Sequence, residues 1–104
     1  MINKEMARDY LLRAGRCLRE AETALNEGDP PATIRRSQEA LELAVKALLR
    51  SLTIEYPRAH DVSDVLLSNA EKLPREIASH LEELSSLIAE LASIRGPAFY
   101  MGKI

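Results

Sequence analysis

The sequence predicts an all-α protein, an up-and-down four-helix bundle that forms a single domain over residues 1–104. Apolar residues recur three and four positions apart along most of the chain, which is the spacing of one helical face. Aromatic residues make up only 4% of the sequence, so leucine, isoleucine, valine and alanine have to build the core. Glycine and proline gather in short stretches that divide the chain into four helical segments, and a short extra C-terminal helix is left open.

The first helix is expected over about residues 3–27. Its apolar residues form one stripe: Met6, Tyr10, Ala14, Cys17, Leu18, Ala21 and Leu25. Four arginines lie off this stripe among acidic residues, namely Arg8, Arg13, Arg16 and Arg19. That mixture is typical of a solvated charged face, and a patch that contacts a phosphate or an acidic partner is the alternative.

The second helix is expected over about residues 31–52, after the stretch Gly28-Asp29-Pro30-Pro31. So short a connection predicts that the first two helices are antiparallel neighbours. The second helix carries a broad apolar surface: Ile34, Leu41, Ala44, Val45, Leu48, Leu49 and Leu52. A helix this apolar is predicted to be central and to contact more than one neighbour.

Residues 55–61 are expected to form a loop, because Pro57 holds Tyr56 out of a helical conformation. A third helix, capped by Asp61 or Ser63, is expected to end at about Lys72, before Leu73-Pro74. The fourth is expected from Pro74 to about Ile94. Its stripe is Ile77, Leu81, Leu84, Leu87, Ile88 and Leu91, and Arg95-Gly96-Pro97 is expected to end it.

Composition restricts the class of function. The net charge of -2 and the pI of about 5.7 argue against a generic nucleic-acid binder, although a local basic site stays open. The single cysteine, Cys17, excludes a disulfide within the chain, suits the reducing cytoplasm and is expected to be a buried, inert thiol. No apolar run reaches the length of a membrane span, so no membrane association is expected.

Few residues suggest chemistry. The two histidines, His60 and His80, have no metal-ligand spacing to a second His or Cys, so neither a metal nor another cofactor is predicted. His60, beside Asp61, either packs the loop or acts as a functional imidazole. Arg36 and Lys46 are expected about 80° apart on their helix, where they border one groove without converging, or simply extend from the edge of the core.

The stretch TIRRSQEALELAVKALLRSLTIEYPRAHDVSDVLL, residues 33–67, resembles the middle of HEPN domains, the "higher eukaryotes and prokaryotes nucleotide-binding" helical family. The matching positions are Arg36, Gln38, Glu39, Ala40, Glu42, Leu43, Lys46, Ala47, Leu48, Leu49, Pro57, His60 and Asp61. The closing RGPAFYMG resembles the Arg-x-x-Ala-x-Tyr-Gly segment of small archaeal members of that family.

The resemblance implies an up-and-down bundle that often forms homodimers and has a link to nucleotides, RNA or a nucleotidyltransferase partner. We expect such a ligand near Arg36, Lys46, His60, Arg95 and Tyr100. The resemblance also implies a place for catalysis, because ribonuclease members bring Arg-x4-to-6-His motifs of two subunits together at the dimer interface.

At that place this chain has Arg95 and Tyr100, an Arg-x4-Tyr, and tyrosine with its pKa near 10 is a poor base at neutral pH. We therefore expect a binding module without a complete ribonuclease motif. The alternative is a toxin-like, metal-independent ribonuclease that uses Arg75 and His80, the one literal Arg-x4-His, although a continuous helix would turn these two side chains about 140° apart.

Overall fold

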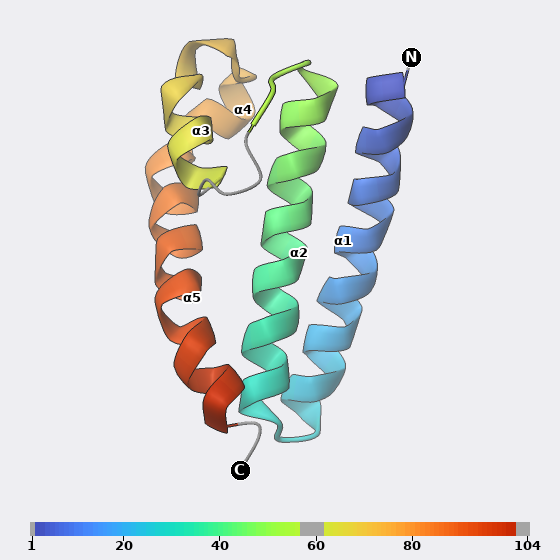
Figure 1. The fold of residues 1–104 in the computed structure, drawn as a ribbon, viewed down its shortest axis with the longest axis vertical. Helices are drawn as coiled ribbons and strands as arrows, with labels where there is room; N and C mark the ends of the chain where they lie inside the picture. The colour runs from blue at the N-terminus through green and yellow to red at the C-terminus, as the bar shows by residue number, and fades with distance from the viewer. Residues whose placement is uncertain (1, 57–61, 102–104) are drawn as a thin grey trace.

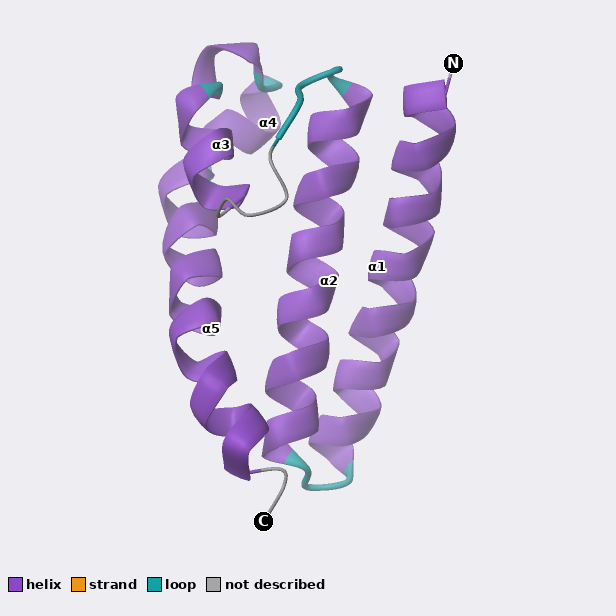
Figure 2. Ribbon diagram, in the orientation of Figure 1, coloured by secondary structure: helices purple, strands orange, loops and turns teal. Residues whose placement is uncertain are grey.

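The computed structural model describes residues 2–56 and 62–101, and every element in these two ranges is helical. The elements are α1 (Ile2–Asn26), α2 (Pro30–Ser51), α3 (Val62–Ser68), the 3-10 turn η1 (Ala70–Lys72), α4 (Arg75–Ala78) and α5 (Leu81–Met101). Figure 2 shows the same elements coloured by type, with short loops between them. The predicted all-α class is confirmed.

The three long helices lie in a row, with α2 between α1 and α5 (Figure 1). The chain descends along α1, returns along α2 and descends again along α5, while α3, η1 and α4 gather at the end of the row where α5 begins. Helix α2 packs against α1, α3 and α5, so it has the central position that its apolar surface predicted. Helix α1 is therefore held mainly by α2.

The turn between α1 and α2 forms for local reasons. Gly28 has a φ of 70°, a left-handed conformation that glycine adopts without strain. The amide of Asp29 donates to the Ala24 carbonyl at 2.9 Å, and the Asp29 side chain accepts a hydrogen bond from the amide of Ala32 at 3.3 Å. One helix is thus closed and the next is capped within four residues.

Alanines join α1 to α2. The buried residues along this contact are Ala7, Ala14, Ala21 and Ala24 on α1, with Ala40 and Ala47 on α2. Side chains this small let two helix backbones approach closely. Larger side chains pack on the other side of α2, where Val45, Leu49, Ile54, Leu66, Leu73 and Ile88 form the core cluster.

The predicted fourth helix, Pro74 to Ile94, begins where expected, with Pro74 as the N-cap of α4, but its continuity and its C-terminal end are wrong. It is divided into α4 and α5 at Ser79 and His80, and α5 continues through Gly96-Pro97 to Met101. Periodicity missed the division because Ile77 and Leu81, on either side of it, both pack against the core cluster. Proline removes a single helical hydrogen bond, so a helix can continue past it with a bend. As far as Met101, no separate C-terminal helix follows α5.

The predicted third helix is likewise two pieces, α3 and η1. Asn69 lies between them, and its side-chain amide donates to the Val65 carbonyl at 2.9 Å. Asparagine competes for backbone partners in this way, which favours a break in the helix. The predicted boundary before Leu73-Pro74 agrees with the end of η1 at Lys72.

Candidate functional site

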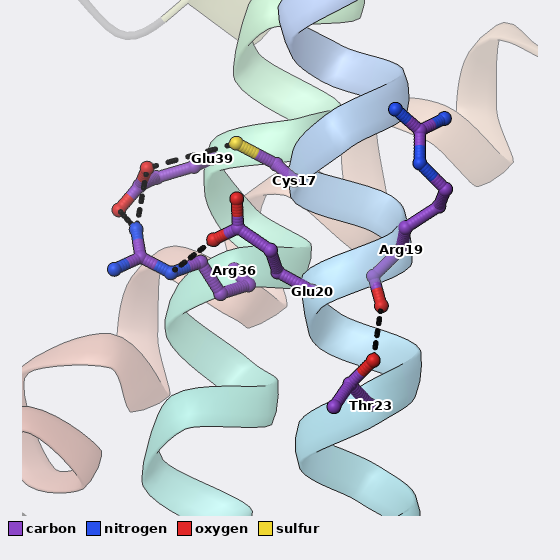
Figure 3. Close-up of polar contacts among 6 residues, drawn as sticks. All are labelled: Cys17, Arg19, Glu20, Thr23, Arg36 and Glu39. Atoms are coloured by element: carbon purple, nitrogen blue, oxygen red, sulfur yellow. Dashed lines mark hydrogen bonds and ion pairs between the residues drawn. The ribbon is translucent and has the colours of Figure 1, made fainter.

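Arg36 lies between α1 and α2 in a cluster of paired charges (Figure 3). Its Nε lies 3.2 Å from the Glu20 carboxylate of α1, and its Nη1 lies 2.9 Å from Oε1 of Glu39 on α2. Glu39 also accepts a hydrogen bond from the Cys17 thiol, with 3.8 Å between the two heavy atoms. Two carboxylates therefore more than balance the single guanidinium charge, and Arg36 links α1 to α2.

This cluster also explains the character of Cys17. Burial raises the pKa of the thiol, and the Glu39 and Glu20 carboxylates raise it further, while Arg36 acts in the opposite direction. A thiol with a raised pKa stays protonated at neutral pH and is a weak nucleophile. The sequence predicted a buried, inert thiol: Cys17 is only half-buried, so burial was overestimated, while its contact with Glu39 favours the inert, protonated form.

Lys46 does not share a site with Arg36. Its ammonium lies 3.1 Å from the Glu42 carboxylate, one turn earlier on α2. Ten residues of helix separate Arg36 from Lys46, a rise of about 15 Å. The groove that contains Arg36 lies at the α1–α2 turn and holds Arg16 and Arg19 beside Glu20, Glu27 and Asp29, so its charges are mixed and Lys46 is absent from it.

Arg75 and His80 are the residues of the literal ribonuclease motif: Arg75 begins α4, and His80 lies in the two-residue division between α4 and α5. The His80 side chain is 63% exposed, and its Nδ1 lies 3.8 Å from the Glu83 carboxylate. The cavity beside it is lined by Glu76 and Glu83 together with apolar side chains, and Arg75 is not among the lining residues. An RNA phosphate would meet two carboxylates here.

A second cavity, of about 300 Å³, opens where the start of α1 meets the end of α2. Its lining residues are Asn3, Arg50, Thr53, Ile54, Glu55 and Tyr56. The end of α2 builds this site: the amide of Thr53 donates to the Arg50 carbonyl at 3.1 Å, and the amide of Ile54 donates to the Leu49 carbonyl at 2.8 Å. This pair of hydrogen bonds ends a helix when the first residue beyond its C-cap, here Thr53, has a left-handed conformation.

Thr53 takes that left-handed conformation, with a φ of 58°, although glycine is the usual residue there. The strain is compensated because Ile54 is carried into the core cluster against Leu49. The chain then turns Tyr56 back over α2, where the Arg50 guanidinium lies 5.5 Å from the centre of its ring, within the range of a cation–π contact.

Arg50 and Tyr56 are close, yet their polar atoms are not satisfied. The Nε of Arg50 and the hydroxyl of Tyr56 are buried and have no hydrogen-bond partner in the part of the chain that the structure describes. The attraction between the guanidinium and the neighbouring Tyr56 hydroxyl, whose geometry falls short of a hydrogen bond, raises the pKa of Arg50 above its usual range, while burial lowers it and Tyr10 adds to the rise. Arg50 is therefore a permanent cation with an unused donor at a cavity wall.

Sequence reasoning missed Arg50, because it read this residue only as part of the second helix. The signal that was available is the pair Arg50 and Tyr56, six residues apart across the end of a helix.

His60 falls within 57–61, outside the described residues. Arg95 and Tyr100 belong to the last turns of α5, and their side chains are outside the described part.

Among residues 2–56 and 62–101, no group of three or more His, Cys, Asp or Glu side chains could hold a metal ion. None of the helices in residues 2–56 and 62–101 combines the length and the apolar character needed to cross a membrane.

Comparison with known proteins identifies the family. The family model for the HEPN domain matches residues 7–103, nearly the whole chain. Neither a curated protein nor a solved structure gives a significant match. The match agrees with the motif positions in residues 33–67 and with an all-α structure. The chain belongs to the HEPN domain family, a class of helical nucleotide-binding and ribonuclease-type modules.

Proposed function

We propose that the protein is a HEPN binding module for a mononucleotide or for a nucleotide unit of RNA, and that the cavity at Arg50 and Tyr56 holds the ligand. The observation that carries the proposal is the pair of buried, unpartnered polar atoms, Arg50 Nε and the Tyr56 hydroxyl, at one cavity. Burying a polar group without a partner is unfavourable by about 1–3 kcal/mol, and a ligand that supplies acceptors removes that penalty.

The chemistry of these side chains fits a nucleotide. A guanidinium presents planar donors that match phosphate oxygens, and aromatic rings stack on bases. A cavity of about 300 Å³ is at the small end of ligand sites, which suits one nucleotide. Glu55 is the acidic residue of the lining, and its side chain is exposed, so solvent screens its repulsion of a phosphate.

Isothermal titration calorimetry with adenosine monophosphate, the other mononucleotides and a short single-stranded RNA tests the proposal. Arg50→Gln is expected to weaken binding about tenfold or more, because a charge-assisted hydrogen bond contributes about 1.5–3 kcal/mol. Glu55→Gln is expected to strengthen it, because a carboxylate leaves the lining. Arg16→Gln, which removes the same charge from a different groove, is the matched control.

Wild-type protein that binds none of these ligands would refute the proposal. Equal losses in Arg50→Gln and Arg16→Gln would instead indicate a diffuse electrostatic effect. Arg36 and Lys46, each paired with carboxylates, are assigned to holding the fold, so neutralising them is expected to alter stability before affinity.

We further propose a homodimer in the cytoplasm, with a nucleotidyltransferase as the expected partner protein. The free, protonated Cys17 suits a reducing compartment. Co-expression with a nucleotidyltransferase encoded beside this chain, followed by gel filtration, tests the partner. Separate elution of the two proteins would count against it.

A further inference from the structure

Part of the apolar stripe of α5 is left uncovered by the fold. Helix α5 lies at the edge of the row opposite α1 (Figure 1). Ile77 and Leu84 pack against the core cluster, but further along the helix Leu87 and Ile94 are 46% and 39% exposed. Leu87 precedes the buried Ile88 by one residue, which turns its side chain about 100° away from the core. The apolar surface of α5 is therefore wider than its neighbours cover.

Residues seven positions apart repeat the same chemistry along this surface. One column is acidic, and the other two are apolar except for His80: Glu76, Glu83 and Glu90; Ile77, Leu84 and Leu91; His80, Leu87 and Ile94. Two apolar columns at this spacing, the a and d positions of a heptad, with charges at the adjacent g position, are the pattern by which one helix binds another. Glu83 lies about 40° from Leu87 around the helix, so the acidic column borders the exposed one.

The break between α4 and α5 makes the beginning of this surface concave. A cavity of about 340 Å³ lies there, and its walls are Glu76, Ile77, His80, Glu83, Leu84 and Leu87. All three columns contribute to these walls, so the heptad register continues across the break. A cavity with apolar walls and carboxylates at its edge can accept an apolar side chain beside a cation.

The acidic column lacks cations of its own. Within residues 2–56 and 62–101, the side chains of Glu76 and Glu90 make no ion pair, and Glu83 lies 3.8 Å from Nδ1 of His80. All three glutamates are exposed. A partner that carries lysine or arginine along one flank would therefore gain attraction without breaking an ion pair to Lys or Arg.

We propose that this surface binds a basic amphipathic helix of a different protein, with its apolar side chains on the α5 seam and its cations along the acidic column. The α5 seam is defined by Leu84, Leu87, Leu91 and Ile94. From Leu84 to Ile94 the seam extends about 15 Å along the helix, and the cavity lengthens it, so the surface has the long, narrow shape of a helix-binding groove.

The same charges exclude a second α5 as the occupant. An antiparallel pair of α5 helices would place one acidic column against the other, and like charges across an interface are unfavourable. A parallel pair would place the glutamates against Leu81 and Ile88, which are engaged in the core of their own chain. Charge complementarity therefore favours a basic helix from another protein.

Fluorescence anisotropy with a synthetic helix of about three heptads, leucine at a and d and lysine at e and g, tests the proposal. Wild-type protein is expected to bind this lysine peptide in the micromolar range, and to bind a peptide with glutamate at e and g at least tenfold more weakly. The combined variant Glu83→Lys/Glu90→Lys is expected to reverse this preference.

Two matched controls separate the surface from general effects. Glu83→Lys is expected to weaken binding of the lysine peptide about fivefold, whereas Glu82→Lys, the same change on another side of the first turn of α5, is expected to change it less than twofold. Leu87→Ser is expected to weaken it about tenfold, whereas Leu25→Ser, at a leucine of α1 that is 66% exposed, is expected to leave it unchanged. Circular dichroism checks that each variant keeps its helices.

The proposal is overturned if the wild type does not bind the lysine peptide at ~1 mM, or binds a scrambled peptide of the same composition equally well. Equal losses in Glu82→Lys and Glu83→Lys would overturn it too. Self-association of the wild type that Leu87→Ser abolishes would show that a second copy covers the seam. Nucleotide binding by these variants is expected to be unchanged, since the cavity at Arg50 contains none of the substituted residues, so the two proposals can fail separately.

Discussion

Replacing Tyr56 by phenylalanine is expected to make the free protein more stable and the nucleotide complex weaker. The substitution removes one buried oxygen that has no hydrogen-bond partner in the described structure and keeps the ring 5.5 Å from the Arg50 guanidinium. An unsatisfied buried polar group is unfavourable by about 1–3 kcal/mol. Because the packing of the ring is unchanged, we expect a gain of about 1 kcal/mol in the free energy of unfolding.

For a domain of this size, about 1 kcal/mol corresponds to a rise in Tm of about 4–8 °C, which differential scanning calorimetry resolves easily. In the complex the same hydroxyl is expected to donate to the ligand. Its loss removes a hydrogen bond of about 1 kcal/mol and weakens binding about fivefold. The two effects have opposite signs, so a general loss of structure cannot imitate them.

Tyr10→Phe is the matched control, because Tyr10 also lies near Arg50 but its hydroxyl is not among the buried unpartnered atoms. It is expected to leave the Tm unchanged or slightly lower. A fall in the Tm of Tyr56→Phe would mean that the hydroxyl has a partner in the folded protein, and the argument for an unused donor at the cavity would fail.

Four further predictions concern the fold and the alternative function. Leu49→Ala, at a residue with no exposed surface, is expected to lower the free energy of unfolding by about 3–5 kcal/mol in urea denaturation, and a loss under 1 kcal/mol would contradict the assignment of the core. Thr53→Gly is expected to raise stability by about 1 kcal/mol and Gly28→Ala to lower it by about as much, because both positions are left-handed; shifts of the same sign would refute this account. Cys17 is expected to react with iodoacetamide more slowly than free cysteine at pH 8, since its pKa is raised, and to accelerate as the pH rises through that pKa; a rate equal to free cysteine would show an ordinary thiol. RNA incubated in EDTA with the wild type is expected to stay intact, whereas cleavage that His80→Ala abolishes would establish the ribonuclease alternative.

The long helices were predictable because their signals are local. The end of α1 at Gly28 and the start of α2 at the two prolines follow from backbone preferences that a few residues determine. The central position of α2 was predictable because apolar residues cover most sides of this helix, so that it can pack against several neighbours. Family membership was predictable from ordered motifs within residues 33–67, since those positions keep fixed spacings.

The errors arose where tertiary contacts override local preference. Ile77 and Leu81 keep a helical spacing because both reach the same core, although the helix between them is broken. Gly96-Pro97 is a strong local stop signal, yet α5 continues through it. The cavity at Arg50 could not be predicted from the sequence for a different reason. It depends on the left-handed conformation of Thr53, which directs the chain so that Tyr56 lies over Arg50 of α2. A threonine in the sequence gives no indication of that conformation.

The position of α1 at the edge of the row implies a partial opening of the fold. The core cluster contains no residue of α1, and alanines, which bury little apolar surface each, make the contact with α2. Helix α1 can therefore separate while the packing among α2, α3 and α5 stays intact, so its amide hydrogens should exchange with solvent faster than those around Leu49. Asn3 would leave the cavity wall in the same event, so a ligand held there should slow exchange along the whole of α1.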